Sequence, residues 1–251
     1  MATFGIEGIR HFAALRASGT IRSTTTGDLT YVFNICDGLR DSLRDAGHTL
    51  AFYWGGNDCF ERDLRDTELD GSDHDWADNV DLFFIVTHGG FWDGQGHIGY
   101  NVEVDKWLGV QSDYRLGNNW NLEWLLIYGC KTVNRADPTH LWDVFQRLHE
   151  FCGAYGDMWD GYVVDEVGED VGDNLTSGMT VSRSWIDGVS DWYVDNHPIV
   201  VAAEVEATFR DGHFDWPNTT QNRDHLMGHG TTVADISPSD KSWLSFRWSE
   251  G

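Results

Sequence analysis

Uniformly apolar runs recur along the chain and predict buried β-strands. The two clearest lie at residues 82–86 (LFFIV) and 125–128 (LLIY), and neither contains a charged residue. A strand with one face in water alternates apolar and polar residues, whereas a strand covered on both faces shows a continuous apolar run. We therefore expect segments 81–86 and 124–128 to be adjacent strands of a sheet that is covered on both sides.

Three further segments complete the predicted strands of the core. Residues 4–9 (FGIEGI) predict the first strand, although their glycines weaken the pattern, and residues 49–54 (TLAFYW) predict the second. Residues 197–206 (HPIVVAAEVE) predict another buried strand, which we expect to be the last of the core.

Helical spacing of apolar residues separates several of these strands. Residues 30–46 have this spacing, with Asp28 placed to cap the helix and Gly47 placed to end it. Residues 141–151 and 181–196 predict two later helices, the first with one apolar face against the sheet. The alternation of strand and helix predicts an α/β fold with a mostly parallel sheet flanked by helices.

The length of 251 residues favours one domain. We expect residues 1–251 to form a single α/β domain, with residues 206–251 as a C-terminal extension packed on it.

Two of the buried strands are followed by residues that can carry chemistry. The run 82–86 is followed by Thr87-His88-Gly89-Gly90, and the run 125–128 by Gly129-Cys130, 42 residues after the histidine. Parallel sheets bind ligands outside the carboxyl ends of their strands, so adjacent strands bring an imidazole and a thiol together as base and nucleophile. The alternatives are a hydrogen-bonded loop histidine and a cysteine that serves as a small buried apolar residue.

These residues resemble the caspase-like cysteine peptidases, a group that includes caspases, legumains, gingipains and separases. In that group the histidine follows one hydrophobic strand and precedes a glycine, and the cysteine follows the next strand after a small residue, as His88-Gly89 and Gly129-Cys130 do here. The resemblance extends loosely over residues 4–205. It is closest to a prokaryotic caspase-like family of unassigned function that has tryptophan-rich helices after the cysteine.

The resemblance implies both a fold and a set of residue roles. The fold is a three-layer α/β/α arrangement. His88 acts as general base and acid, Cys130 is the nucleophile, and the N–H groups of Gly89 and Cys130 form the oxyanion hole. One departure is that Lys131-Thr132 follows the cysteine, where caspases have Arg-Gly and legumains have Ser-Gly.

Three functions follow from this pattern. The first is a cysteine-dependent acyl-transfer enzyme, a peptidase or a peptide ligase or cyclase, whose substrate is a peptide or protein. In it an imidazolium lowers the pKa of the thiol, and Asp93 is the acid nearest in sequence for orienting His88. The second is a catalytically silent caspase-like module that binds a peptide or protein, favoured by the atypical residues after Cys130. The third is a different enzyme that acts on small molecules.

The charge of the chain is strongly negative, at −24, and it has an unusual composition. Aspartate accounts for 30 of the 41 acidic residues, and only three lysines accompany 14 arginines. Acidity alone does not explain so thorough a loss of lysine, and we interpret the composition as adaptation to molar salt, where the Debye length is only ~3 Å. The same charge disfavours nucleic acid and anionic membranes as partners.

The cysteines and the N-terminal sequence predict a cytoplasmic location. The four cysteines form no C-x-x-C pair and no dense disulfide framework, which favours reduced thiols. The first residues carry no basic region ahead of an apolar run, and no apolar stretch reaches the length of a membrane-spanning helix. The sequence does not indicate an oligomeric state.

We predict neither a cofactor nor a metal site. His225 and His229 are four residues apart, but the glycines at 228 and 230 argue against a helix that would bring them together. The segment 66–79 is rich in aspartate but lacks the spacing of a calcium loop, and we interpret it as a solvated acidic loop. Of the other histidines, His97 would lie in a loop.

Overall fold

The computed structural model describes residues 1–12, 27–101, 107–118, 121–190, 195–210 and 213–250. A seven-stranded sheet forms its centre, in the order β12-β9-β8-β7-β3-β1-β2. The strands are β1 (Thr3–Gly8), β2 (Thr49–Gly55), β3 (Leu82–Val86), β7 (Trp124–Tyr128), β8 (Glu150–Ala154), β9 (Pro198–Val205) and β12 (Lys241–Trp248). The first five run parallel to one another, and β9 pairs antiparallel with both β8 and β12.

The two central strands confirm the prediction made from their apolar runs. β3 pairs parallel with β7, with Phe83 opposite Leu125 and Val86 opposite Tyr128. Every residue of both strands is buried. Phe83 and Ile85 belong to the core on one face of the sheet, while Phe84 belongs to the core on the other face. Because both faces need apolar side chains, the sequence shows no alternation.

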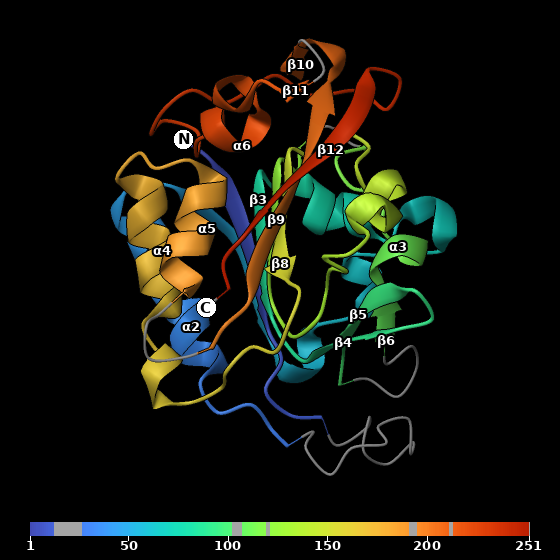
Figure 1. Ribbon diagram of the computed structural model, residues 1–251. Coiled ribbons are helices and arrows are strands. Elements are labelled where there is room, and N and C mark those ends of the chain that lie inside the picture. The colour runs from blue at the N-terminus through green and yellow to red at the C-terminus, as the bar shows by residue number, and fades with distance from the viewer. Residues whose placement is uncertain (13–26, 102–106, 119–120, 191–194, 211–212, 251) are drawn as a thin grey trace.

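One face of the sheet is covered by three α-helices, α2 (Val32–Asp45), α4 (Val167–Thr176) and α5 (Val181–Val189), which Figure 1 shows together on one side. Helices α2 and α4 approach closely, because a side chain at Gly168 would come within 1.8 Å of the Ile35 carbonyl oxygen. Only glycine therefore permits this spacing. Helix α2 confirms the predicted helix at 30–46, and Gly47 ends it with φ of 91°.

The start of α2 differs from the prediction in its capping residue. Asp28 does not cap the helix, because its carboxylate accepts from the Phe12 N–H and pairs with Nδ1 of His11 at 2.9 Å. The carboxylate of Asp160 accepts instead from the N–H groups of Thr30 and Tyr31, at 2.6 and 2.9 Å. A carboxylate at this end of a helix is favoured by the helix dipole, but a residue so distant in sequence leaves no local signal.

The other face is covered by short elements, including α3 (Val110–Asp113) and a small antiparallel sheet of β4 (Gly89–Trp92), β5 (Gln95–Gly99) and β6 (Trp107–Gly109). Figure 1 shows these on the side of the sheet opposite α2, α4 and α5. The predicted α/β class, a mostly parallel sheet flanked by helices, is confirmed. The remaining short elements are 3₁₀ turns at Gly56–Asp58, Glu61–Asp63, Thr67–Leu69, Asp73–Asp75, Ala77–Asn79, Pro138–Val144, Tyr162–Val164, Glu206–Thr208 and Trp216–Asn218, helix α6 (Thr220–Arg223), and strands β10 (Phe209–Arg210) and β11 (His213–Phe214).

The predicted helix at 141–151 is wrong. Its first part is the 3₁₀ turn Pro138–Val144, and its end runs into strand β8 (Glu150–Ala154). All five residues of β8 are buried, and a short apolar run of this kind cannot be assigned to helix or strand from periodicity alone. His149 consequently lies in the interior with 1 % of its surface exposed, and His140 lies on the 3₁₀ turn, partly exposed.

The strand β9 is not the last of the core. The chain returns as β12, which pairs antiparallel along β9 with Phe246 opposite Val201. Residues 206–251 therefore contribute an edge strand to the central sheet. Polar residues such as Ser242, Ser245 and Arg247 interrupt β12, which is why its sequence lacks the continuous apolar run of the other strands.

The acidic segment 66–79 is not a solvated loop throughout. It folds into 3₁₀ turns in which Asp66, Asp73 and Asp78 are each at most 1 % exposed. Asp73 accepts from the N–H and hydroxyl groups of Thr67, and Asp78 accepts from the N–H of Gly117 at 2.8 Å. Aspartate side chains satisfy main-chain donors in tight turns, so part of the acidity serves local structure.

No helix among the described residues has both the length and the apolar character needed to cross a membrane.

Candidate active site

The ends of β3 and β7 lie side by side, as their sequences predict. Pairing continues one residue past β3, where the N–H of Thr87 donates to the Tyr128 carbonyl at 3.1 Å. The next residues are in direct contact, because a side chain at Gly89 would come within 2.2 Å of the Cys130 carbonyl oxygen. A glycine is therefore required at position 89 to bring the segment after His88 against the segment that holds Cys130.

His88 and Cys130 line the same cavity, which has a volume of about 760 Å³. Its walls come from segments that are distant in sequence, chiefly residues 27–29, 87–92, 128–131 and 157–160. The cavity opens at the carboxyl ends of the parallel strands, the edge at which such sheets bind ligands.

The imidazole of His88 is oriented by a main-chain carbonyl. Its Nε2 lies 2.9 Å from the carbonyl oxygen of Gly27, and its ring lies 4.4 Å from that of Phe12 between centroids. A carbonyl only accepts hydrogen bonds, so Nε2 carries the hydrogen and Nδ1 holds the lone pair of the neutral ring. Sequence proximity suggested Asp93 as the orienting group, but Asp93 lies in the turn after β4 with φ of 50°. An orienting carbonyl has no side-chain signal, so the sequence could not reveal Gly27.

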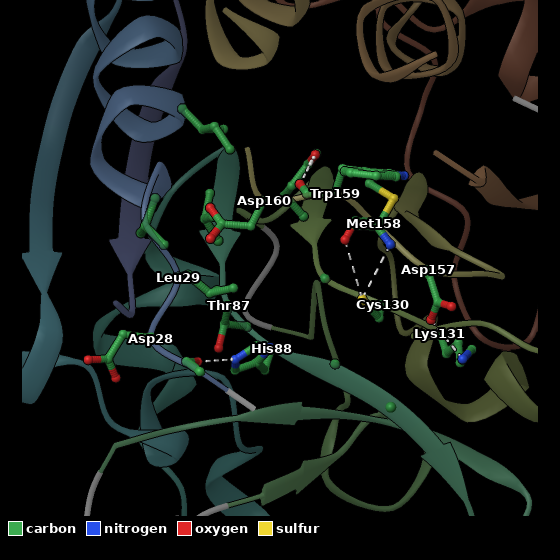
Figure 2. Close-up of a pocket in the computed structure, with 18 of the residues that line it drawn as sticks. Asp28, Leu29, Thr87, His88, Cys130, Lys131, Asp157, Met158, Trp159 and Asp160 are labelled. Atoms are coloured by element: carbon green, nitrogen blue, oxygen red, sulfur yellow. Dashed lines mark hydrogen bonds and ion pairs between the residues drawn. The ribbon is translucent and has the colours of Figure 1, made fainter. Parts of the chain in front are cut away.

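The thiol of Cys130 lies against the main chain of Met158. The Met158 N–H donates to Sγ at 3.3 Å, and Sγ lies 3.7 Å from the Met158 carbonyl oxygen. Figure 2 shows the two side chains engaged in different directions, His88 toward Gly27 and Cys130 toward Met158. Burial raises the pKa of the Cys130 thiol above its ordinary value, although the Met158 N–H acts in the opposite direction. In this conformation the thiol is covered by the Met158 main chain.

The segment 157–160 that covers the thiol is fixed at several points. Besides the bonds from Asp160 to the start of α2, the Trp159 N–H donates to Oδ1 of Asn196 at 2.8 Å, and the Tyr128 hydroxyl donates to the Trp159 carbonyl at 2.8 Å. Asp160 ties this wall of the cavity to residues 27–31, the wall that orients His88.

Cys130 differs from the other three cysteines in its exposure. Cys36, Cys59 and Cys152 are buried, whereas Cys130 is partly exposed. Burial also raises the pKa of the three buried thiols. Since reactive cysteines require access to reagent, Cys130 is the thiol of this chain best placed to react.

Lys131, directly after the cysteine, has an uncommon backbone conformation. Its φ is 53°, in the left-handed region that a residue with a side chain seldom adopts. Its ammonium pairs with the Asp157 carboxylate at 2.7 Å, an interaction that Figure 2 shows beside Cys130. The positive φ turns the chain sharply after Cys130, and its strain lies at the candidate site.

The two donors expected of an oxyanion hole lie on adjoining segments. A side chain at Gly129 would come 3.6 Å from the N atom of Gly89, so the amides of Gly89 and Cys130 are close to one another at the cavity edge. The N–H of Gly89 is directed away from β5, because Gly89 and Ile98 form a pair without mutual hydrogen bonds.

The remaining histidines do not assemble into a second site. His97 lies in strand β5, not in a loop, and its ring stacks on that of Trp92 at 3.7 Å between centroids. Nε2 of His229 faces Nε2 of His48 at 2.9 Å, whereas Nδ1 of His225 contacts the Arg223 carbonyl at 2.7 Å. In the described part of the chain, no group of three or more histidine, cysteine or acidic side chains has the geometry of a metal site.

The chain is thus an α/β domain with a mostly parallel sheet. A thiol and an imidazole at adjoining strand ends make its site a candidate cysteine-nucleophile site. The chain belongs to the family described as a domain of unknown function, DUF6345, whose model matches residues 6–250. No curated protein matches the sequence.

Two solved structures of cysteine proteases are similar to this chain. One is the Drosophila initiator caspase Dronc, with 11 % identity and a TM-score of 0.39, over 68 % of this chain and 64 % of that one. The other is a secreted C11 cysteine protease from Bacteroides thetaiotaomicron, "iotapain", with 9 % identity and a TM-score of 0.47, over 80 % of this chain and 65 % of that one. The match thus spans less than two thirds of either structure.

Proposed function

We propose that this chain is a caspase-like, cysteine-dependent acyl-transfer enzyme in which Cys130 is the nucleophile and His88 the general base and acid. The observation that carries the proposal is the position of Cys130. It is partly exposed, unlike the other cysteines, and lines one cavity with a histidine whose ring is already oriented by a carbonyl. Acyl transfer uses a nucleophile, a base and a group that orients the base, and this cavity offers a candidate for each.

The reaction would begin when the thiol leaves the Met158 main chain. The thiolate of Cys130 attacks the substrate carbonyl carbon, a C–S bond forms, and the N–H groups of Gly89 and Cys130 hold the oxyanion. Loss of one such donor typically costs ~2.7–4 kcal/mol of transition-state stabilisation. The C–N bond then breaks, and His88 gives the thiol proton to the leaving amine. Water or a second amine attacks the thioester, which releases the acyl group and restores the thiol.

We propose a peptide or protein as substrate. The sequence resemblance to caspase-like peptidases supports this choice, since that group acts on peptide bonds. The cavity of about 760 Å³ falls in the usual range for binding sites. Whether water or an amine receives the acyl group decides between a peptidase and a ligase or cyclase. We further propose that DUF6345 is the prokaryotic caspase-like family that the sequence resembles.

A silent binding module is the second candidate. It is favoured by the state of the thiol, which is covered by Met158 and has a raised pKa. In that case the cavity would hold a peptide or protein without covalent chemistry, and Lys131 in place of a small or arginine residue would mark the loss of activity.

Labelling with iodoacetamide, with the modified residue identified by mass spectrometry, tests the proposal. We expect Cys130 to react far faster than the three buried cysteines in the folded protein, and Cys130→Ala to abolish that signal with little loss of stability. His88→Ala should slow the reaction of Cys130 at neutral pH and move its pH midpoint upward, because no imidazolium then favours the thiolate.

A Cys152→Ala variant serves as the matched control, and its Cys130 signal should persist. Equal labelling of all four cysteines, without dependence on His88, would support the silent module.

We also propose a salt-adapted, cytoplasmic protein. The net charge of −24 repels itself at low ionic strength and is screened in concentrated salt. The melting temperature should therefore rise steeply between low salt and molar KCl. A melting temperature that does not change with KCl concentration would contradict the interpretation of the low lysine content as adaptation to salt.

A further inference from the structure

Strand β4 is an edge strand that begins at the candidate site. In the small sheet of order β4-β5-β6, its only strand neighbour among the described residues is β5. It follows His88 directly, and all four of its residues line the cavity. An edge strand presents a row of N–H and C=O groups that can pair with another extended chain.

The register of the hairpin determines which groups point toward the cavity. The turn between β4 and β5 has two residues, Asp93 and Gly94, with φ of 50° and 82°. The pair that flanks such a turn, Trp92 with Gln95, is hydrogen-bonded. Hydrogen-bonded and non-bonded pairs then alternate along the hairpin. The bond from the Gly99 N–H to the His88 carbonyl, at 2.9 Å, fits this alternation.

It follows that the N–H and C=O groups of Gly89 and Phe91 are directed away from β5. These two residues are opposite Ile98 and Gly96 in the pairs without mutual hydrogen bonds. In the described part of the chain no hydrogen bond engages the main-chain groups of Gly89 and Phe91 on the outer edge of β4, and Gly89 also contacts Cys130. A chain placed along this edge would reach the main-chain segment that holds Cys130.

We propose that the outer edge of β4 binds the main chain of an extended peptide as an added strand and thereby presents a carbonyl to Cys130. This inference rests on the proposed function and specifies its substrate class. The substrate is an unfolded segment, because a helix has no main-chain donors or acceptors left for an edge. Recognition through the main chain gives affinity with broad tolerance of side chains, and the partly exposed ring of Trp92 adds an apolar contact.

A single position of β4 allows a direct test. The N–H of Phe91 points away from β5, so Phe91→Pro removes a donor from the outer edge without removing a bond of the hairpin. Phe91→Ala is the matched control, because it removes the same ring, which contacts His140 at 6.2 Å between centroids, but keeps the N–H. The comparison of these two variants isolates one main-chain donor.

Two probes separate peptide binding from thiol reactivity. The first is acetyl-Ala-Ala-Ala chloromethyl ketone, from which the Cys130 sulfur displaces chloride as a C–S bond forms. The second is iodoacetamide, which reacts in the same way with loss of iodide but has no peptide to pair. The measured quantity is the ratio of the two labelling rates of Cys130, determined in molar KCl. We expect this ratio to be about tenfold lower for Phe91→Pro than for Phe91→Ala.

A second measurement uses the unaltered protein, in case Phe91→Pro does not fold. Chloromethyl ketones that are N-methylated at one amide at a time should show an alternating pattern, because only every second residue of an added strand donates to its neighbour. Methylation of a donating amide should lower the ratio about tenfold, and methylation of the next amide should leave it almost unchanged.

The outcomes separate this inference from the proposed function. Equal ratios for Phe91→Pro and Phe91→Ala, or a uniform effect of N-methylation, overturn strand addition, while rapid labelling of Cys130 that depends on His88 still upholds the enzyme. If neither probe labels Cys130 faster than the buried cysteines, the proposed function itself fails.

Discussion

His88 and His149 lie at opposite ends of the parallel strands and are held in opposite ways. His88 follows β3 at the carboxyl end, where Nε2 donates to a neutral carbonyl and the ring lines a cavity. His149 precedes β8 at the amino end and is buried, with Nδ1 2.9 Å from Asp224 and Nε2 3.5 Å from Asp235. A histidine beside a buried strand is therefore not in itself a sign of chemistry.

The two histidines differ in how their hydrogen-bond partners affect protonation of the ring. Burial alone would lower the pKa of His149, but the hydrogen bond to Asp224 and the nearby carboxylate of Asp235 outweigh burial and raise this pKa to about 10. A ring held as a cation cannot act as a base near neutral pH. It instead fixes the C-terminal residues 224–235 to the sheet. The carbonyl partner of His88 orients the ring through Nε2 and adds no charge beside it.

The largest effect on this comparison is expected from Asp224→Ala. Asp224 also accepts from Nε1 of Trp124 at 2.7 Å and from the N–H of Val233 at 2.8 Å. The substitution leaves a buried cation with one carboxylate and two donors without their acceptor. We expect a loss of about 3–5 kcal/mol in the free energy of unfolding, measured by denaturant titration in molar salt.

Asp195→Ala is the surface control for this substitution. It removes a carboxylate that is 74 % exposed and lies 3.5 Å from His197, so a change within about 0.5 kcal/mol is expected. A loss at Asp224 no larger than at Asp195 would contradict the role of the buried pair.

The second prediction concerns the pH dependence of stability. The folded pKa of His149 lies above its ordinary value, so its stabilising contribution is complete below about pH 6.5 and is lost as the pH rises toward 10. Burial raises the pKa of Glu123 and Glu204 to about 7, and their ionisation between about pH 4.5 and 7 lowers stability in the same direction. The melting temperature should therefore fall from pH 5 to pH 7. Toward pH 10 the loss of the His149 contribution lowers it further, whereas Lys241, whose pKa burial lowers to about 8, loses its buried charge and acts in the opposite direction.

His88→Ala and Asp224→Ala show which of the two histidine sites causes the pH dependence of the melting temperature. The profile of His88→Ala should follow that of the unaltered protein, while Asp224→Ala should remove the His149 contribution between pH 7 and 10. The same profile across that range in Asp224→Ala and in the unaltered protein would contradict the assignment of His149 as a buried cation.

The sequence predicted the centre of the fold better than its edges. Strands β3 and β7 were predictable because both faces of each are buried and the apolar run is continuous. The helix predicted at 141–151 failed because buried β8 has a run too short to distinguish from helix. That His88 and Cys130 line one cavity followed from the pairing of parallel strands, but Gly27 and Met158 act through main-chain atoms, which no residue type reveals.

The smallest expected effect concerns the main chain of Met158, which covers Cys130. It tests whether the segment beside Cys130 can move, in contrast to the fixed segment around His149. The carboxylate of Asp160 holds the segment 157–160 to the start of α2 through the N–H groups of Thr30 and Tyr31. Asp160→Ala removes both charge-assisted bonds. With that attachment lost, the Met158 main chain should cover the sulfur for less of the time, and iodoacetamide should label Cys130 a few-fold faster at neutral pH.

The control variant must also lose a helix cap, which lowers the free energy of unfolding by about 1 kcal/mol. Thr180→Ala does so, because the Thr180 hydroxyl accepts from the N–H of Arg183 at the start of α5 and does not line the cavity. Faster labelling in both variants would show that general loosening exposes the thiol. Faster labelling in Asp160→Ala alone would show that one carboxylate, fixed to a helix start, holds the main chain over the sulfur. Its release would then be the step that separates the covered thiol from a reactive one.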